Sequence, residues 1–404
     1  MATQSFIIAA KRTPFGAFGG KLKDLTANEL GGIAAKAAID SLPKEMQAHL
    51  RQSASPRQSV IFGNVLQTST DAPYLARHVG HRAGLPVTTP ATTVNRLCTS
   101  GFQAIINAVQ EIKSDDTDIS ITGGSESMSQ APYALRNVRW GAKFGPEYLK
   151  MEDTLLAALT DRYPESVPMA ITAERLASKY GVTRQECDSF ALQSQQRWAQ
   201  SNEAGVFSSE ITPIDVKVKR KTEQMVSDEH PRPQTTIEAL ERLVPVFQKD
   251  GVVTAGNASG ISDGASAVIV ASESVVTQHN IKPLARILSY HTVGVEPGIM
   301  GIGPVEAIRG AVEKAGLSLG QMDLIEINEA FAAQVLSCAK ALDIDPVNLN
   351  TSGGSIALGH PLGASGSRIM GHLAHRLKET GKRYAVGSAC AGGGQGVAIV
   401  IEAL

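Results

Sequence analysis

The sequence contains few cysteines. Its 404 residues include four, Cys98, Cys187, Cys338 and Cys390, and no two of them form a C-x-x-C pair. A long chain with so few cysteines is typical of a reduced, intracellular protein, so a disulfide framework is not expected. A zinc-binding module built on Cys98, Cys390 and His360 would need clustered ligands at short spacings, which these residues lack. We therefore expect no metal site.

Long apolar runs and an excess of charge are also missing. No stretch reaches the about 18 consecutive apolar residues of a membrane span, so no transmembrane segment is expected. The apolar run before Lys11 and Arg12 is too short for a signal peptide, and no removable presequence is visible. The formal net charge of -1 argues against nucleic acid or an anionic membrane as a partner.

The composition that remains is that of an ordinary globular protein, with 43% hydrophobic and 19% charged residues. The length predicts two to three domains. Strand-like apolar runs alternate with amphipathic helical patterns, which indicates an α/β fold. Between about residues 128 and 260 the chain becomes richer in charge, aromatic residues and proline. We interpret this region as an inserted, mostly helical segment with long loops.

The two ends of the chain repeat each other. Residues 99–124 align without gaps on residues 364–389, an offset of 265, and both segments continue from Ser-Gly through an amphipathic helix to a strand. Residues 60–65 fall on residues 324–329 at an offset of 264. We predict an N-terminal half of residues 1–127 with 261–282, an insertion of residues 128–260, and a C-terminal half of residues 283–404.

Cys98 is a candidate nucleophile. It precedes the Ser-Gly step that opens a helical pattern, where backbone N–H groups and the helix dipole favour a thiolate. The alternative is a buried cysteine that acts as a small hydrophobic residue. Cys187 and Cys338 lie inside helical patterns, and we interpret both as structural.

Three further segments carry candidate chemistry. His360 lies among five glycines between Gly353 and Gly366, which suits a general base, although a solvated loop histidine is the alternative. Asn328 ends an apolar strand, where ligands often bind, but it is also a common helix cap. Cys390 is followed by three glycines whose N–H groups can hold an oxyanion or simply form a turn. The repeat places these strand and loop ends in related positions, which predicts one shared cleft.

Several motifs in order along the whole chain resemble those of the thiolase family. They are AAKRTPFG, NRLCTSGFQ, GGSESMSQAP, DEHPRPQTT, VTAGNASGISDGAS, NEAFA, GGSIALGHPLGASGSR and GSACAGGGQG. The resemblance implies a five-layered αβαβα fold of two duplicated halves, with an inserted loop domain that covers coenzyme A. It also implies thiolytic cleavage of 3-ketoacyl-CoA to acetyl-CoA and a shortened acyl-CoA, as in fatty acid β-oxidation. Coenzyme A is then a co-substrate, and no cofactor is expected.

The resemblance also assigns roles to individual residues. Cys98 would be the nucleophile that carries the acyl group, Cys390 the second catalytic cysteine, and His360 the base. Asn328 would hold a water for one oxyanion hole, and the N–H groups of Cys98 and Gly392 would form the other. Coenzyme A contacts are implied for Arg232, Thr235 and Ser259, and Met169 and Phe331 would line the pantetheine channel.

The sequence departs from the family pattern at a few positions. Thr99 stands where Gly or Ala is usual, and Ser352 and Ser355 replace the usual Asn and Ala. Pro168 occupies the place of a histidine that acetoacetyl-specific members tend to carry, which favours the broad-range degradative class. An acetoacetyl-CoA thiolase that works in the condensing direction is the alternative.

Other classes fit less well. Ketosynthases and hydroxymethylglutaryl-CoA synthases also use a nucleophilic cysteine but lack a second cysteine in C-x-G-G-G, so Cys390 argues against them. A non-catalytic acyl-CoA carrier would not need both cysteines and His360.

The basic run of residues 217–221 either attracts the phosphates of coenzyme A or only protects a strand edge. By resemblance we expect a homodimer or homotetramer, with residues 130–141 as a second contact, in the mitochondrial matrix or otherwise the cytoplasm.

Overall fold

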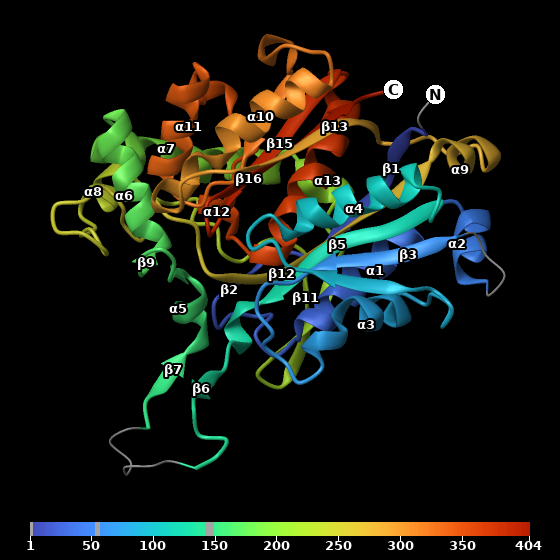
Figure 1. The fold of residues 1–404 in the computed structure, drawn as a ribbon, viewed down its shortest axis with the longest axis horizontal. Coiled ribbons are helices and arrows are strands. Elements are labelled where there is room, and N and C mark those ends of the chain that lie inside the picture. Colours follow the sequence, from blue (N-terminus) through green and yellow to red (C-terminus); the bar gives the residue numbers. More distant parts are fainter. Residues whose placement is uncertain (1–2, 53–56, 142–148) are drawn as a thin grey trace.

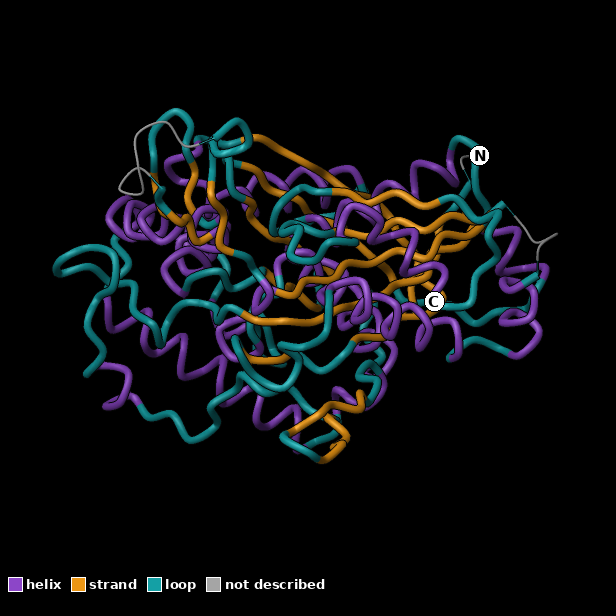
Figure 2. The backbone as a smooth tube through the Cα atoms, turned by 90° about the horizontal axis from the view of Figure 1, so that it is seen from below, coloured by secondary structure: helices purple, strands orange, loops and turns teal. Residues whose placement is uncertain are grey.

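The centre of the molecule is one large mixed sheet. A computed structural model describes residues 3–52, 57–141 and 149–404, so part of the predicted insertion, residues 142–148, lies outside the described residues. Within the described residues ten strands join, and Figure 2 shows them running through the middle of the molecule between helices. They are β1 (Ser5–Arg12), β2 (Gly16–Ala17), β3 (Gln58–Gly63), β4 (Ala91–Val94), β5 (Ile119–Ser127), β12 (Ser262–Ser272), β13 (Ala285–Gly294), β14 (Leu324–Ile327), β15 (Tyr384–Ala391) and β16 (Gln395–Glu402).

The order of the strands shows the duplication. The sheet runs β14-β15-β16-β13-β1-β12-β5-β3-β4, so the order outward from β1 repeats the order outward from β13. The outer pairs β3 with β5 and β14 with β15 are parallel, and the inner pairs are antiparallel. The offset of 264 to 265 therefore predicts the strand equivalences correctly. The two halves also join edge to edge, because residues 5–7 pair with residues 285–287.

Helices form three layers around the two halves of the sheet (Figure 1). One outer layer contains α1 (Ala27–Asp40), α2 (Lys44–Arg51) and α3 (Leu75–Arg82), and the other contains α10 (Gly303–Lys314) and α11 (Ala332–Leu342). Between the halves lie α4 (Ser100–Lys113) and α13 (Leu362–Thr380), which share one apolar core with both parts of the sheet. Each outer layer buries a core of its own. The predicted five-layered αβαβα fold is thus confirmed.

The two central helices touch at equivalent glycines. A Cβ atom on Gly101 would lie 2.6 Å from the backbone nitrogen of Ser367, and one on Gly366 would lie 2.4 Å from that of Phe102. Both distances are shorter than any normal carbon contact, so a side chain at either position would force the helices apart. The repeated Ser-Gly step therefore sets how closely the first turns of α4 and α13 approach, and these turns follow the Cys98 and His360 loops.

The helices of the predicted insertion lie at one end of the sheet (Figure 1). Its helices are α5 (Thr154–Ala158), α6 (Met169–Tyr180), α7 (Arg184–Glu203) and α8 (Ile237–Glu241). Its described residues also form three two-stranded sheets, β6 (Tyr133–Leu135) with β7 (Met151–Asp153), β8 (Thr160–Asp161) with β9 (Val167–Pro168), and β10 (Ile214–Val218) with β11 (Lys221–Met225). The β6–β7 pair extends away from the body. The domain boundaries stay a prediction.

Two short helices complete the elements named here, α9 (Glu273–Gln278) and α12 (Ser355–Leu358). The first follows β12 on the surface. The second precedes the loop that carries His360 and packs against α7 of the insertion. No helix among the described residues is long and apolar enough to cross a lipid bilayer.

Candidate active site

Cys98 lies in a tight turn between β4 and α4. Leu97 has a φ of +49°, a left-handed conformation that is uncommon for a residue with a side chain. The Ser100 hydroxyl accepts from the backbone N–H of Arg96 (2.9 Å) and donates to the carbonyl of Leu97 (2.6 Å). These two hydrogen bonds hold the turn, so the strained conformation places Cys98 at a fixed position one residue before the helix cap Thr99.

The surroundings of the Cys98 sulfur keep it protonated. Burial raises the pKa of the thiol to about 11, although the N–H groups of Gly392 and of Cys98 itself act in the opposite direction. The nearby carboxylate of Glu126 raises the pKa further. Cys98 is half-buried, and desolvation outweighs the backbone N–H groups at the start of α4, so the resting thiol is favoured over the predicted thiolate. Ionisation of Cys98 needs a base.

His360 is buried in the loop before α13. Its backbone N–H donates to the carbonyl of Gly260 (2.9 Å), and its Nδ1 atom lies 2.6 Å from the Ser365 hydroxyl oxygen. Ser365 donates its own hydrogen to the carbonyl of Pro361, so the hydroxyl oxygen accepts from Nδ1–H of His360. The Nε2 atom then carries the free lone pair. Burial, with the positive charge of Arg368, lowers the pKa of His360 to about 3, which leaves the ring neutral.

Asn328 faces the free nitrogen of His360. It follows β14, and its Nδ2 atom lies 3.3 Å from His360 Nε2. The Ser355 hydroxyl donates to Asn328 Oδ1 (2.6 Å), which directs the amide nitrogen toward the histidine. Ser355 is one of the positions at which the sequence departs from the family pattern, so the added hydroxyl has a definite contact. The sequence alone did not predict this contact.

Cys390 lies near the end of β15 and is completely buried. Burial raises the pKa of its thiol well above the usual value, and the nearby sulfurs of Cys98 and Cys338 act in the same direction. Cys98 and Cys390 come from opposite halves of the chain, yet they are close enough to influence each other electrostatically. Cys390 packs in a small apolar cluster with Met300 and Ala330, next to Met169 and Phe331.

Gly392 connects the two cysteine segments. A Cβ atom there would lie 3.1 Å from Leu97 Cδ1 and 3.5 Å from Met169 Sδ, so the backbone after Cys390 packs directly on the Cys98 turn. The next residue, Gly393, has a φ of +72°, which favours glycine. The structure thus brings Cys98, Cys390, Gly392 and Met169 into one neighbourhood.

The remaining cysteines lie in the packed core. Cys338 donates its thiol hydrogen to the carbonyl of Gly301 (3.2 Å), and burial raises the pKa of its thiol to about 12. Cys187 is also buried, with its pKa raised to about 12 for the same reason. No group of three or more histidine, cysteine or acidic side chains with the geometry of a metal site occurs in the part of the chain that the structure describes.

The predicted coenzyme A residues lie on two adjoining segments. Arg232 is exposed and Thr235 half-buried, and the Gln195 side chain accepts from the backbone N–H of Arg232 (2.8 Å). The N–H of Ser259 donates to the carbonyl of Ala330 (3.0 Å), beside Phe331.

Asp228 and His230 hold the segment that carries Arg232. Asp228 accepts from the buried guanidinium of Arg12 (2.6 Å). His230 Nδ1 lies 2.9 Å from the carbonyl of Ala357, in the short helix before the His360 loop. The segment is therefore held by hydrogen bonds to β1 and to α12, and Arg232 itself is exposed.

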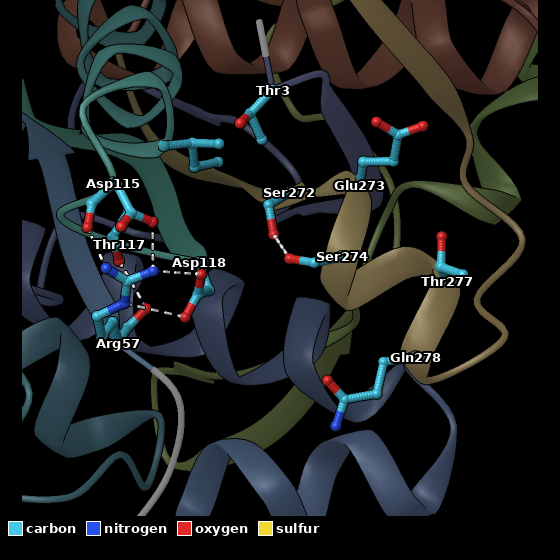
Figure 3. A pocket seen from close by; sticks show the side chains of 11 residues that line it. Thr3, Arg57, Asp115, Thr117, Asp118, Ser272, Glu273, Ser274, Thr277 and Gln278 are labelled. Atoms are coloured by element: carbon cyan, nitrogen blue, oxygen red, sulfur yellow. Dashed lines mark hydrogen bonds and ion pairs between the residues drawn. The ribbon is translucent and has the colours of Figure 1, made fainter. Parts of the chain in front are cut away.

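A cavity of about 640 Å³ lies away from all of these residues (Figure 3). It is at the opposite end of α4, between the start of β5 and the α9 segment, and it contains none of the predicted site residues. Its one arginine, Arg57, already pairs with Asp115 and Asp118. We assign no function to this cavity.

Glu126 and Glu329 are buried carboxylates that sequence reasoning missed. Glu126 lies at the end of β5 and Glu329 directly follows Asn328. Both belong to motifs that carry the family resemblance, GGSESMSQAP and NEAFA, so the position within a motif was the available signal. Burial raises the pKa of both carboxyl groups, that of Glu126 to about 7.

Comparison with known proteins agrees with the arrangement. The family profiles "Thiolase, N-terminal domain" and "Thiolase, C-terminal domain" match residues 5–274 and 281–403. The mitochondrial 3-ketoacyl-CoA thiolase of Mus musculus is 59% identical over 399 residues, which cover 98% of each chain. A crystal structure of human mitochondrial 3-ketoacyl-CoA thiolase has a TM-score of 0.94 and 57% identity, and covers 100% of this chain and 99% of its own.

The same human protein has been solved in complex with CoA, with a TM-score of 0.93, 57% identity, and coverage of 100% of this chain and 98% of that chain. The first profile covers the N-terminal repeat together with the insertion, and the second covers the C-terminal repeat. The similarity extends over the whole length at an identity far above the level at which only a fold is shared. The chain belongs to the thiolase family.

Proposed function

We propose that this protein is a 3-ketoacyl-CoA thiolase, which cleaves a 3-ketoacyl-CoA with coenzyme A into acetyl-CoA and an acyl-CoA shortened by two carbons. The observation that carries the proposal is the neighbourhood of Cys98 and Cys390 beside the Cys390–Gly392 backbone. One thiol alone can carry an acyl group. A proton donor is needed as well where a carbon leaving group must receive a proton, and a second thiol can supply it.

The first half-reaction begins with transfer of the Cys98 proton to His360 Nε2. Separately, burial disfavours both the thiolate and the imidazolium, but the transfer creates both charges at once, and they attract each other strongly in a buried site. The thiolate attacks the keto carbon of the substrate, and a carbon–sulfur bond forms. The resulting oxyanion is stabilised by hydrogen bonds, for which we assign a water held by Asn328 together with His360.

Cleavage and acyl transfer follow. The bond between C2 and C3 breaks and leaves its electron pair on the acetyl-CoA fragment, which takes a proton from Cys390. The N–H groups of Cys98 and Gly392 stabilise the thioester oxygen of the fragment. A coenzyme A thiol then gives its proton to Cys390 and attacks the acyl group on Cys98. The Cys98 thiolate leaves and recovers its proton from His360, so all groups return to their starting state.

The substrate range follows from the surroundings of Cys98. The residue contacts an apolar cluster formed by Leu66, Met128, Leu155 and Leu362, three of which are branched leucines able to pack on an acyl chain. Pro168, directly before Met169, adds no polar group. We therefore favour broad-range degradation of 3-ketoacyl-CoA esters in β-oxidation.

Steady-state thiolysis across chain lengths tests the proposal. We expect the highest kcat/KM for substrates longer than acetoacetyl-CoA, with acetyl-CoA as a product in every case. Activity confined to acetoacetyl-CoA, with faster condensation than cleavage, would instead support the alternative of an acetoacetyl-CoA thiolase. No product from any 3-ketoacyl-CoA would refute both.

Arg232 is proposed to bind the phosphates of coenzyme A. Its guanidinium is exposed while its backbone is fixed, so it presents a charge at a defined place. We expect Arg232→Ala to raise the KM for coenzyme A roughly tenfold and to lower kcat much less, the pattern of lost uniform binding. Arg220→Ala, on the β10–β11 hairpin, is the matched control and should leave the KM unchanged. The reverse result would place the phosphate contact on the hairpin.

Location and assembly are part of the same proposal. The relatives named above are mitochondrial proteins, and we place this chain in the mitochondrial matrix. We propose a homodimer or a homotetramer. The β6–β7 arm has exposed apolar side chains at Tyr133 and Met151, 63% and 67% accessible, which a second contact between subunits would cover.

A further inference from the structure

Glu126 is a buried carboxylate that the mechanism above does not use. Its side chain is 0% exposed and accepts four hydrogen bonds. The donors are Asn64 Nδ2 (3.0 Å) and the backbone N–H groups of Val65 (3.1 Å), Leu66 (2.9 Å) and Gly363 (2.8 Å). A carboxylate with this many aligned donors is held firmly in place. Two oxygens of one side chain thus collect four donors.

The donors come from both halves of the molecule. Residues 64–66 follow β3 in the N-terminal half, and both Val65 and Leu66 belong to the apolar cluster around Cys98. Gly363 lies in the first turn of α13 in the C-terminal half, three residues after His360. The Glu126 carboxylate therefore contacts both the residues that pack beside Cys98 and the first turn of α13, which follows His360.

The contact between the halves is also sterically tight at this point. A Cβ atom on Gly124 would lie 1.8 Å from the carbonyl oxygen of Gly363, and one on Gly363 would lie 2.7 Å from the carbonyl oxygen of Gly63. The first turn of α13 is therefore seated against the ends of β3 and β5. Glu126 accepts a hydrogen bond from the N–H of Gly363 at this contact.

We propose that Glu126 is a positioning residue. It fixes residues 64–66, which pack beside Cys98, and the first turn of α13, which follows His360, relative to each other, and it keeps a negative charge near Cys98. The proposal rests on the function proposed above. The contact accounts for the alignment of groups from different halves, and the charge of Glu126 adds to the desolvation that keeps the Cys98 thiol neutral at rest. The titratable and charged groups around the pair are Asp263, beside Glu126, and the neutral His360, beside Arg368.

Two substitutions separate the geometry from the charge. Glu126→Gln keeps the length of the side chain and removes the charge, whereas Glu126→Asp keeps the charge and withdraws it from the donors. Glu329→Gln is the matched control, because Glu329 is also buried and accepts from Ser194, Asn350 and the N–H of Ile356. Folding of each variant is checked by its thermal unfolding midpoint.

Two measurements are made on each variant. The first is kcat for thiolysis of a 3-ketoacyl-CoA, and the second is the rate of iodoacetamide labelling of Cys98 against pH, followed by peptide mapping. We expect both Glu126 variants to lose roughly 10- to 100-fold in kcat, because small misplacements of reacting groups are costly. Glu126→Gln alone should shift the labelling profile to lower pH and raise the labelling rate at pH 8 several-fold, because a nearby negative charge has been removed.

A merely structural role would not produce that combination. Three results would overturn the proposal. The first is loss of turnover in Glu126→Gln with an unchanged labelling profile, and the second is the same shift of the profile in Glu329→Gln. The third is a kcat of Glu126→Gln within twofold of the parent. If Glu126→Gln does not fold, Glu126→Asp decides the question. That variant keeps the charge, so a fall in its kcat together with a shift of its Cys98 labelling profile would also refute the proposal. A parent protein without thiolysis activity would refute the proposed function, while the labelling profiles would still report on the charge.

Discussion

Replacement of Cys98 by alanine is expected to abolish thiolysis, with a fall in kcat on the order of 10⁵-fold or more, the scale seen when a covalent nucleophile is removed. Both half-reactions pass through the same carbon–sulfur bond, so no part of the cycle survives. The backbone N–H groups of residue 98 and of Gly392 remain, but no thiolate is present to attack the substrate. The variant should still bind coenzyme A.

Two assays test this result. Labelled acetyl-CoA should leave no acyl group on the variant, and acetoacetyl-CoA with coenzyme A should give no acetyl-CoA above background. Cys187→Ala is the control, because Cys187 lies on the buried face of α7 and has no place in the mechanism. An acyl-enzyme that still forms on the Cys98→Ala variant would contradict the assignment of the nucleophile.

Replacement of Cys390 by serine is expected to separate the two half-reactions. The buried Cys390 thiol is neutral at rest, since burial and the neighbouring sulfurs raise its pKa, so it holds a proton that a carbanion can take. A serine hydroxyl is a far weaker acid. Cleavage and condensation should fall by about 10²- to 10⁴-fold, the usual contribution of general acid–base catalysis. Exchange of acetyl groups between Cys98 and coenzyme A should fall less, because it involves no carbon leaving group.

The comparison is made between labelled acyl-enzyme formation from acetyl-CoA and cleavage of acetoacetyl-CoA in the same preparation. His360→Ala serves as the contrasting variant and should impair both reactions, because it takes the Cys98 proton. An equal loss of both reactions in Cys390→Ser would mean that Cys390 supports the site structurally and is not the acid for the carbon centre.

Much of the fold was predictable from the sequence because the two halves repeat each other at a nearly constant offset in residue number. The offset of 264 to 265 aligned β3 with β14 and α4 with α13, and the Ser-Gly steps marked where the central helices touch. The pairing of β1 with β13 was not predictable, because it depends on an edge contact between the halves and leaves no trace in either sequence.

The candidate site residues could be proposed from the sequence, but their electrostatics could not. The position of Cys98 before α4 suggested a thiolate, but the burial that opposes ionisation comes from segments far away in the chain, including Leu155 and Leu362. The hydrogen bond from Ser355 to Asn328 and the cradle around Glu126 likewise need the assembled halves. Local sequence gives a residue its neighbours along the chain, while the pKa depends on its neighbours in space.

The pairing of β1 with β13 also bears on how such a chain arose. These two strands occupy equivalent places in the two halves, and they run antiparallel at the centre of the sheet. Two separate copies of a single half would meet in this way about a two-fold axis, with each copy covering the exposed strand edge of the other. The contact therefore has the geometry expected of a chain formed by fusion of two such copies. In this single chain it keeps the Cys98 half and the His360 half permanently together.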